Sequence, residues 1–335
     1  QFKVKTRLTP YDELTVMALA GVDRMELNTD LAGEDEGSDY ILSYLPKIEQ
    51  ETFTVGASYR HYAGRHVQTY VLSHNYLNDK NLKYRNNDEG TEENLTLRLR
   101  STEQKTTFRA ENMTTLPGGW TLKEGAELNY MDYTDQLVLT GALNDIGEAL
   151  TENVPDSYRM GIELMLGIKP CKWFQWDINA TWSKNRIKNF VENIPIYDDD
   201  WHLLDVASVS HKSTRIAFSP DFLLNNRFAF TYQGFEASLQ SQFVGKQYMT
   251  NAEVETLTLD KYFVSNLNLA YTFKPRKVAK EITLGVTVYN LFNEEYENNG
   301  WASSSYDKDV NHRIDSAGYA AQAGTNVMGH VSFRF

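Results

Sequence analysis

Absences limit the classes of protein to which this sequence can belong. Of its 335 residues only Cys171 is a cysteine, so neither an internal disulfide nor a metal site built from cysteines can form. No run of about 18 apolar residues is present, which excludes a membrane-spanning helix. Lysine and arginine number 33 against 45 aspartates and glutamates, and the net charge of −12 argues against a nucleic acid as partner.

Catalytic motifs are missing as well. The sequence contains no G-x-S-x-G nucleophile turn, no H-E-x-x-H zinc helix and no glycine-rich loop that could cradle a phosphate. Its seven histidines are scattered, and their spacing indicates no metal site. We therefore expect a protein that is not an enzyme and that has no resident cofactor.

Aromatic residues, in contrast, are abundant. Tyrosine (20), phenylalanine (16) and tryptophan (6) make up 13% of a chain whose mean hydropathy is −0.50. Aromatic side chains favour strands and gather at membrane interfaces. A β-barrel in an outer membrane combines this aromatic content with a polar average, because only every second residue of a strand meets lipid.

The final segment, 323–335, shows the strand pattern most clearly. One side of this period-2 strand is apolar and ends on an aromatic residue, while the other side is mainly polar. The apolar set is Val327, Val331, Phe333 and Phe335, and the opposite set is Met328, His330, Ser332 and Arg334. Similar alternation marks 52–60, 158–168, 172–183 and 263–273. Such strands suit a wall between lipid and a watery lumen.

We predict thirteen strands. Their approximate spans are 1–9, 12–22, 51–62, 66–78, 94–116, 120–131, 157–168, 172–185, 221–231, 235–245, 261–273, 281–291 and 323–335. Short turns alternate strictly with long connections, which lie at about 23–50, 79–93, 132–156, 186–220, 246–260 and 292–322. This alternation is typical of tight periplasmic turns and long external loops. The predicted fold is therefore all-β, an antiparallel up-and-down transmembrane β-barrel.

One segment, 94–116, interrupts the pattern. Leu95, Leu97 and Leu99 occupy odd positions, whereas Phe108 and Ala110 occupy even ones, so the apolar phase changes once. We interpret 94–116 as one long strand with a bulge or with an upper part above the membrane. The alternative is a hairpin at Ser101–Lys105, which would break the alternation of short and long connections.

Motifs in the final third of the chain closely resemble those of TonB-dependent outer-membrane receptors. Val286–Tyr296 contains N-L-F-N-E-E-Y, which is similar to the penultimate-strand signature N-L-F-(D/N)-x-x-Y of that family. Phe243–Tyr248 resembles their Y-V-G-x-x-Y, and Ser219–Asp221 resembles the proline that opens an earlier strand. Gln322–Asn326 looks like the closing P-x-x-G-R region in a Bacteroidetes-type variant. The motifs cover about residues 211–335, and upstream only the architecture extends the resemblance.

The resemblance implies a 22-stranded barrel around an N-terminal plug, with a short peptide that engages TonB. The thirteen strands would be about the last thirteen of 22, and 1–335 would be the C-terminal portion of the barrel. An odd strand count fits this expectation, because bacterial single-chain barrels close with even numbers. The location implied is the bacterial outer membrane. The partners implied are TonB, the missing barrel and plug segment (in the same or a separate chain), membrane lipid, lipopolysaccharide and a small-molecule ligand.

The function implied by the resemblance is capture of a scarce metal chelate, followed by TonB-driven import. A ferric siderophore is the expected ligand, and haem and cobalamin are alternatives. A passive porin-like channel, an importer of glycans or peptides, and a barrel enzyme or adhesin stay open as rivals. A plug and a TonB-engaging segment upstream of Gln1 would distinguish the active importer from the passive channel.

The long loops carry the candidate ligand contacts, because binding residues of barrels concentrate on loops above a rigid scaffold. In Ile196–His202, two aromatic residues, a histidine and three carboxylates lie together. The residues expected to contact ligand are Tyr197, Trp201, His202, Tyr248, Trp301 and Tyr306. Asp198, Asp199 and Asp200 are candidate Ca²⁺ ligands, although the regular spacing of a calcium loop is missing. The competing interpretations are a solvated acidic loop tip and aromatic anchors at the membrane interface.

Overall fold

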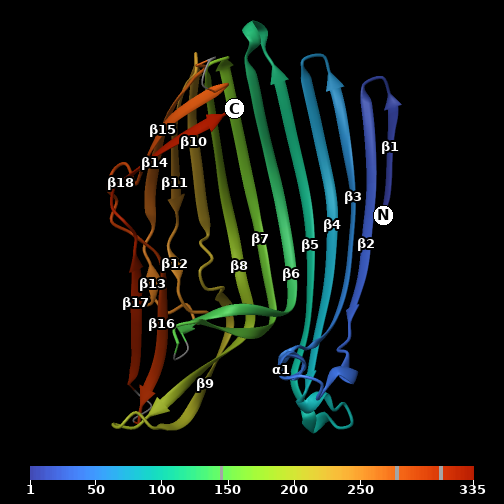
Figure 1. Ribbon diagram of the computed structural model, residues 1–335, viewed down its shortest axis with the longest axis vertical. Helices are drawn as coiled ribbons and strands as arrows, with labels where there is room; N and C mark the ends of the chain where they lie inside the picture. The colour runs from blue at the N-terminus through green and yellow to red at the C-terminus, as the bar shows by residue number, and fades with distance from the viewer. Residues whose placement is uncertain (144–145, 276–278, 309–311) are drawn as a thin grey trace.

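A computed structural model describes residues 1–143, 146–275, 279–308 and 312–335, most of which belong to one long, curved sheet (Figure 1). Thirteen strands follow one another along its main path, each antiparallel to the next, as predicted. They are β1 (Phe2–Thr9), β2 (Asp12–Met25), β3 (Lys47–Ala63), β4 (His66–Tyr84), β5 (Leu95–Thr115), β6 (Thr121–Leu143), β7 (Ala149–Cys171), β8 (Phe174–Tyr197), β10 (Phe222–Tyr232), β11 (Phe235–Val244), β14 (Tyr262–Phe273), β15 (Glu281–Tyr289) and β18 (Asn326–Arg334).

The remaining elements belong to the connections. β9 (Leu203–Arg215) pairs with β8, β16 (Glu297–Asp307) pairs with β17 (Arg313–Ala321), and β12 (Gln247–Tyr248) pairs with β13 (Thr258–Leu259). The helices are α1 (Glu36–Tyr44) and the 3-10 turns η1 (Thr29–Leu31), η2 (Arg85–Asn87), η3 (Glu92–Asn94) and η4 (Pro117–Gly119). Within the described part of the chain, no helix has the length and apolar character needed to cross a membrane.

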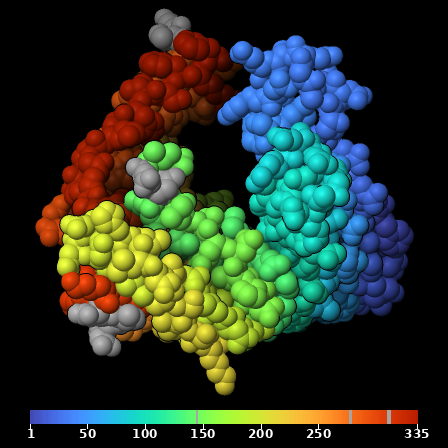
Figure 2. Space-filling view, turned by 90° about the horizontal axis from the view of Figure 1, so that it is seen from below, coloured from blue at the N-terminus to red at the C-terminus, as the bar shows by residue number. Residues whose placement is uncertain are grey.

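The sheet is an arch that encloses an open space (Figure 2). In the residues that the structure describes, β1 and β18 each pair with one strand, so the arch is not closed into a complete barrel. α1, β9, β16 and β17 all lie toward one end of the strands (Figure 1). The short turns lie at the opposite end, which the predicted topology assigns to the periplasm.

The two faces of the arch differ in the way that the alternation predicts. The outer face exposes large apolar side chains, among them Leu164 (45% exposed), Trp182 (49%) and Phe333 (55%). In an aqueous globular domain such a surface would be buried, whereas lipid solvates it without cost. Alternate residues point into the arch and are mainly polar. In the described part of the chain, the buried apolar clusters lie in the extensions near the loops, and the apolar outer face of the spanning strands suits contact with lipid.

Several segments predicted as loops are in fact strand. β6 continues to Leu143 and β7 begins at Ala149, so most of 132–156 is a hairpin that extends the sheet beyond the apolar band. β8 and β9 do the same across 186–215. The period-2 pattern fades in these extensions because neither face of the hairpin meets lipid. The predicted short turn at 274–280 includes 276–278, which lie outside the described residues.

Segment 94–116 forms a single strand, so the alternative hairpin at Ser101–Lys105 is wrong. The pairing of β5 with β4 runs without interruption from Leu97 opposite Lys83 to Thr114 opposite His66. The bulge lies at the loop end, next to Leu95, instead of in the middle of the strand. Leu97 and Phe108 consequently face opposite sides of the sheet. The apolar phase changes because Leu97 lies near the loops, where no lipid selects for an apolar outer face.

Candidate functional site: the inner wall and the loop assembly

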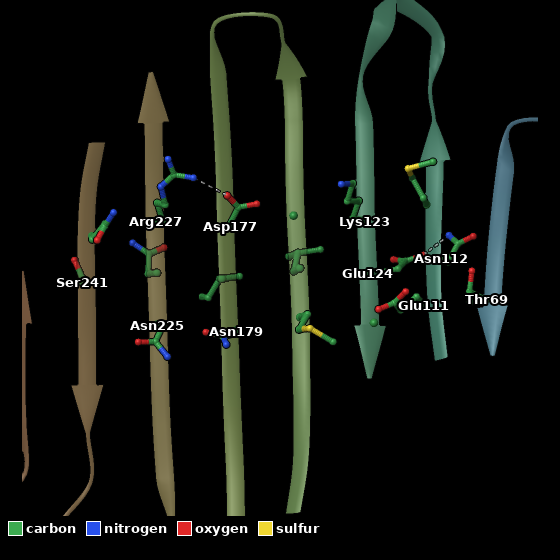
Figure 3. A pocket seen from close by; sticks show the side chains of 18 of the residues that line it. Thr69, Glu111, Asn112, Lys123, Glu124, Asp177, Asn179, Asn225, Arg227 and Ser241 are labelled. Carbon is green, nitrogen blue, oxygen red and sulfur yellow. Dashed lines mark hydrogen bonds and ion pairs between the residues drawn. The ribbon is translucent and has the colours of Figure 1, made fainter. Parts of the chain in front are cut away.

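The inner wall of the arch lines a cavity of about 1130 Å³ (Figure 3). β8 contributes Asp177 and Asn179, and β10 contributes Asn225 and Arg227. Arg227 Nη1 lies 3.7 Å from Asp177 Oδ2, and Asn179 Nδ2 donates to Glu163 Oε1 at 3.2 Å. These side chains point inward because they occupy the polar phase of strands whose other phase is apolar. The wall can therefore form hydrogen bonds with whatever fills the lumen.

These wall residues were not among the predicted ligand contacts. The signal that could have identified them was already present, because Asp177 and Asn179 lie on the polar side of the alternation in 172–183. The predicted contacts were instead aromatic, histidine and acidic residues, most of them in the long loops. The register places Asp177 beside Arg227 across β8 and β10, which no local pattern reveals.

At the other end of the strands, long connections pack into one body, here called the loop assembly. It comprises residues 136–143, 146–154, 186–215, 246–259, 297–307 and 313–321. Arg313 on β17 is its central cation, with Nη2 at 2.7 Å from Glu192 Oε1 and Nε at 2.8 Å from Asp315 Oδ1. His211 Nε2 lies 3.0 Å from Glu192 Oε2. Glu192 and His211 belong to the β8–β9 hairpin and Arg313 to the β16–β17 hairpin, so this network joins two hairpins that are far apart in sequence.

A second set of ion pairs fixes the connection between β11 and β14. Glu253 Oε1 accepts hydrogen bonds from Arg186 and from Arg215, each at 2.9 Å. Beside it, Met249, Leu257 and Leu259 are almost fully buried and pack with Ala302 of β16. Burial of this apolar cluster is the hydrophobic contribution to the stability of the loop assembly. The connection is therefore a packed element, with side chains anchored on both sides.

Three of the predicted ligand contacts lie together at the tip of the β8–β9 hairpin. The rings of Tyr197 and Trp201 have centroids 5.7 Å apart, and Trp201 is 69% exposed with a left-handed φ of 64°. His202 is solvated and its Nδ1 lies 3.1 Å from Asp198 Oδ2. The backbone of Tyr306 lies near this tip, because β16 pairs in parallel with the end of β8 and places Tyr306 opposite Ile196. The structure thus brings a strand that is distant in the sequence next to the β8–β9 hairpin.

The other two predicted contacts lie elsewhere. Tyr248 is 8% exposed, its hydroxyl bonds to Glu255, and the Arg215 guanidinium lies 5.3 Å from the ring centroid. This ring is an internal support of the loop assembly. Trp301, on β16, is 39% exposed and lies against Gly318, where an added Cβ would come within 2.2 Å of its Nε1. Ligand contact by either residue stays a prediction.

The acidic run beside Trp201 is engaged within its own turn. Asp198 Oδ1 accepts hydrogen bonds from the backbone N–H groups of His202 (2.8 Å) and Asp200 (2.9 Å), and Asp199 pairs with Lys308. The backbone N–H of His202, in particular, lowers the pKa of Asp198 below its usual value. Among the described residues, no group of three or more His, Cys, Asp or Glu side chains is placed to hold a metal ion. Calcium binding here stays a prediction.

Acid is expected to loosen the contact between β17 and its neighbours. Burial alone would raise the pKa of Asp315, but hydrogen bonds from Arg313 and Ser304 outweigh burial and lower that pKa below its ordinary value. The ionised carboxylate therefore stabilises the folded loops above the unfolded-state pKa, and this contribution is lost as the pH falls through the folded-state pKa. We expect pepsin to cut within β16–β17 more readily as the pH falls below the ordinary pKa of an aspartate. In Asp315→Asn this extra pH dependence should disappear, and an unchanged pH profile in the variant would contradict the assignment.

Comparison with known proteins gives one family match and several similar solved structures. Residues 125–291 match the family model described as TonB dependent receptor-like, beta-barrel. Among curated proteins, none matches the chain. Similar solved structures include the FrpB iron transporter from Neisseria meningitidis, F3-3 variant (12% identity, TM-score 0.46), which the chain matches over 99% of its own length and 54% of that chain. The siderophore receptor PirA from Pseudomonas aeruginosa is 9% identical with a TM-score of 0.46, and the match covers 98% of this chain and 51% of PirA. The ferric enterobactin receptor PfeA (G324V mutant) from Pseudomonas aeruginosa is 11% identical with a TM-score of 0.34, and the match covers 97% of this chain and 68% of PfeA. The chain thus spans about half the length of the first two proteins.

Proposed function

The chain belongs to the TonB-dependent receptors of the outer membrane, and on this basis we propose that it forms part of a receptor that imports a scarce metal chelate. A ferric siderophore is the preferred ligand, and haem and cobalamin are alternatives. The observation that carries the proposal is the division of the arch into an apolar outer face and a polar inner wall, with packed loops at one end only. A polar inner wall with a packed loop assembly at one end suits a protein that takes up ligands selectively better than a purely structural protein.

Import against a gradient needs an energy source and a way to close the lumen, and both are part of the proposal. TonB would supply the energy through a segment that is not among these residues. A plug would fill the polar lumen, whose wall offers hydrogen-bond partners such as Asn179, Asn225 and Gln242. Residues 1–335 would be the C-terminal portion of the barrel, with the other strands supplied by the rest of the protein or by a companion chain.

The receptor would do no covalent chemistry on its ligand. The exposed aromatic pair Tyr197 and Trp201 offers stacking surfaces, and polar groups come from His202 in the same turn and from Tyr306 on the adjacent strand β16. A chelate with aromatic or apolar edges and polar oxygens would use both kinds of contact. This tip is therefore the proposed first contact for ligand.

Binding of radioactive ferric siderophores by the intact receptor tests the proposal. In Trp201→Ala we expect about tenfold weaker binding, because loss of an aromatic anchor at a binding surface has an effect of this size. Trp120→Ala is the matched control, since Trp120 is also exposed but lies beside the short turn before β6, at the opposite end of the strands.

Two results would overturn the proposal. The first is a receptor that binds no iron chelate, haem or cobalamin, and whose deletion leaves growth on each of them unchanged. The second is a steady ion conductance of the intact protein in planar bilayers, which would favour a passive channel. Equal binding by the Trp201 and Trp120 variants would instead move the ligand site away from the β8–β9 tip.

A further inference from the structure

The outer part of the β6–β7 hairpin leaves the line of the arch. In Figure 1 the far ends of β6 and β7 turn sideways toward β16, and in Figure 2 the corresponding green segment projects into the enclosed space. The turn begins near Asp135, whose φ of 54° is left-handed. Pairing between the two strands nevertheless continues, with Gln136 opposite Val154 and Leu139 opposite Thr151. The hairpin therefore extends inward as an ordered ribbon.

One face of this ribbon is buried against other strands. Val138 and Val154 are 5% and 1% exposed, and they pack in a cluster with Ile187, Phe190 and Ile216. Leu137, the residue before Val138, faces the other way and is 56% exposed. A hairpin that swung freely would expose the two valines to water whenever it moved away from β8. The burial of one face therefore opposes displacement.

Asn251 joins the ribbon to its neighbours by hydrogen bonds. It is 1% exposed, and its amide nitrogen donates to the carbonyl of Leu139 (2.8 Å) and to Glu152 (3.1 Å), one on each strand of the hairpin. Its amide oxygen accepts from the backbone N–H of Ala217 at 2.9 Å. One buried side chain thus ties β6, β7 and the connection after β9 together. If the hairpin moved away, this amide would lose two of its hydrogen-bond partners, which opposes the movement.

Backbone contact adds to this attachment. At Gly141 the φ is +90°, and an added Cβ would lie 2.1 Å from the carbonyl oxygen of Met249. The backbone at Gly141 and the backbone at Met249 therefore lie so close together that only glycine fits at position 141. The connection that carries Met249 and Asn251 is itself held by the ion pairs of Glu253 with Arg186 and Arg215. The anchor of the hairpin is fixed to β8 and β9.

We propose that the outer part of the β6–β7 hairpin (residues 136–143 and 146–154), here called the roof, stays fixed over this side of the lumen, with Asn251 as its positioning residue. Ligand then passes beside the roof without displacing it. Passage of ligand beside the hairpin rests on the proposed import function, whereas the fixed position of the hairpin rests on its packing and hydrogen bonds alone. Ligand size would accordingly be limited by the space between the roof and strands β2 to β5.

A reversible crosslink tests the passage of ligand. In the intact receptor, with Cys171 replaced by serine, cysteines at Val138 and Ile187 are joined by a short thiol-specific crosslinker that a reducing agent cleaves. These positions share the buried cluster, and Cys171 lies near a short turn at the other end of β7. Uptake of a radioactive ferric siderophore should be the same before and after cleavage. Uptake that is abolished by the crosslink and restored by reduction would overturn the proposal, and the single-cysteine variants control for the reagent.

Hydrogen exchange needs no ligand, so it shows whether the roof is held in place even if the receptor imports no siderophore. Amides of 136–143 and 149–154 should exchange as slowly as those of 186–194 in β8. In Asn251→Ala they should exchange faster by at least tenfold, while β8 is unchanged. Asn193→Ala is the matched control, because Asn193 is exposed and bonds only to Ser208 among the described residues. Fast exchange of the hairpin in the unaltered receptor would overturn the roof.

Discussion

Leu164→Arg is expected to destabilise the barrel by about 2–4 kcal/mol, whereas Met165→Arg, one residue further along the same strand, should have little effect. Leu164 is 45% exposed and lies on the outer face, which is expected to contact lipid. Met165 lines the polar cavity on the inner face. A guanidinium on the lipid side loses its hydration in hydrocarbon, while one in the lumen keeps it.

The measurement is unfolding by guanidinium chloride in lipid vesicles, followed by heat-modifiable electrophoretic mobility. The two variants carry the same new side chain at neighbouring positions, so each controls for the size and charge of the other. Equal destabilisation would mean that the two faces meet the same environment, and a larger effect at Met165 would reverse the assignment of the faces.

Arg313→Met is expected to release β16–β17 from the loop assembly with a loss of about 3 kcal/mol in docking free energy. The variant keeps the length of the side chain but leaves Glu192 and Asp315 without their cation. The side chains of these two carboxylates are 12% and 22% exposed, so water compensates only part of the loss. The opening equilibrium of the hairpin should increase on the order of 100-fold.

Limited proteolysis of the folded receptor at neutral pH measures this change as the rate of cleavage within 297–307 and 313–321. Arg98→Met is the control, because Arg98 and Glu92 form an ion pair whose side chains are 58% and 87% exposed. Pairs of this kind contribute less than about 1 kcal/mol. A cleavage rate for the Arg313 variant no higher than that of the Arg98 variant would show that the network around Arg313 does not hold the loops.

The membrane-spanning part of the fold was predictable from the sequence because lipid imposes a simple rule on it. Every second side chain must be apolar over about ten residues, and this period is visible in single strands such as 158–168 and 323–335. All thirteen strands of the main path were located in this way. The helix α1 was missed. It is short, its first turn is capped by Asp35, and its apolar residues Tyr40, Ile41 and Tyr44 are largely exposed, so no amphipathic stripe marks it.

The candidate site was less predictable, because its contacts join residues that are distant along the chain. Asn251 bonds to Leu139 across 112 residues, and Arg313 pairs with Glu192 across 121. No periodicity encodes such pairings. The proximity of Tyr197, Trp201 and His202 required only a short loop, and it was predicted. The position of the Tyr306 backbone near them depends on a parallel pairing of β16 with β8 that strand patterns do not specify.

The six tryptophans divide into groups that report on different surroundings. Trp176 and Trp182 belong to the outer face, Trp120 and Trp173 lie beside short turns, and Trp201 and Trp301 belong to the loops. Brominated lipids should therefore quench a part of the intrinsic fluorescence that water-soluble quenchers reach poorly. An iron chelate at the β8–β9 tip should quench the emission of Trp201 while leaving the lipid-facing tryptophans bright, so one spectroscopic titration can separate insertion of the wall from occupation of its entrance.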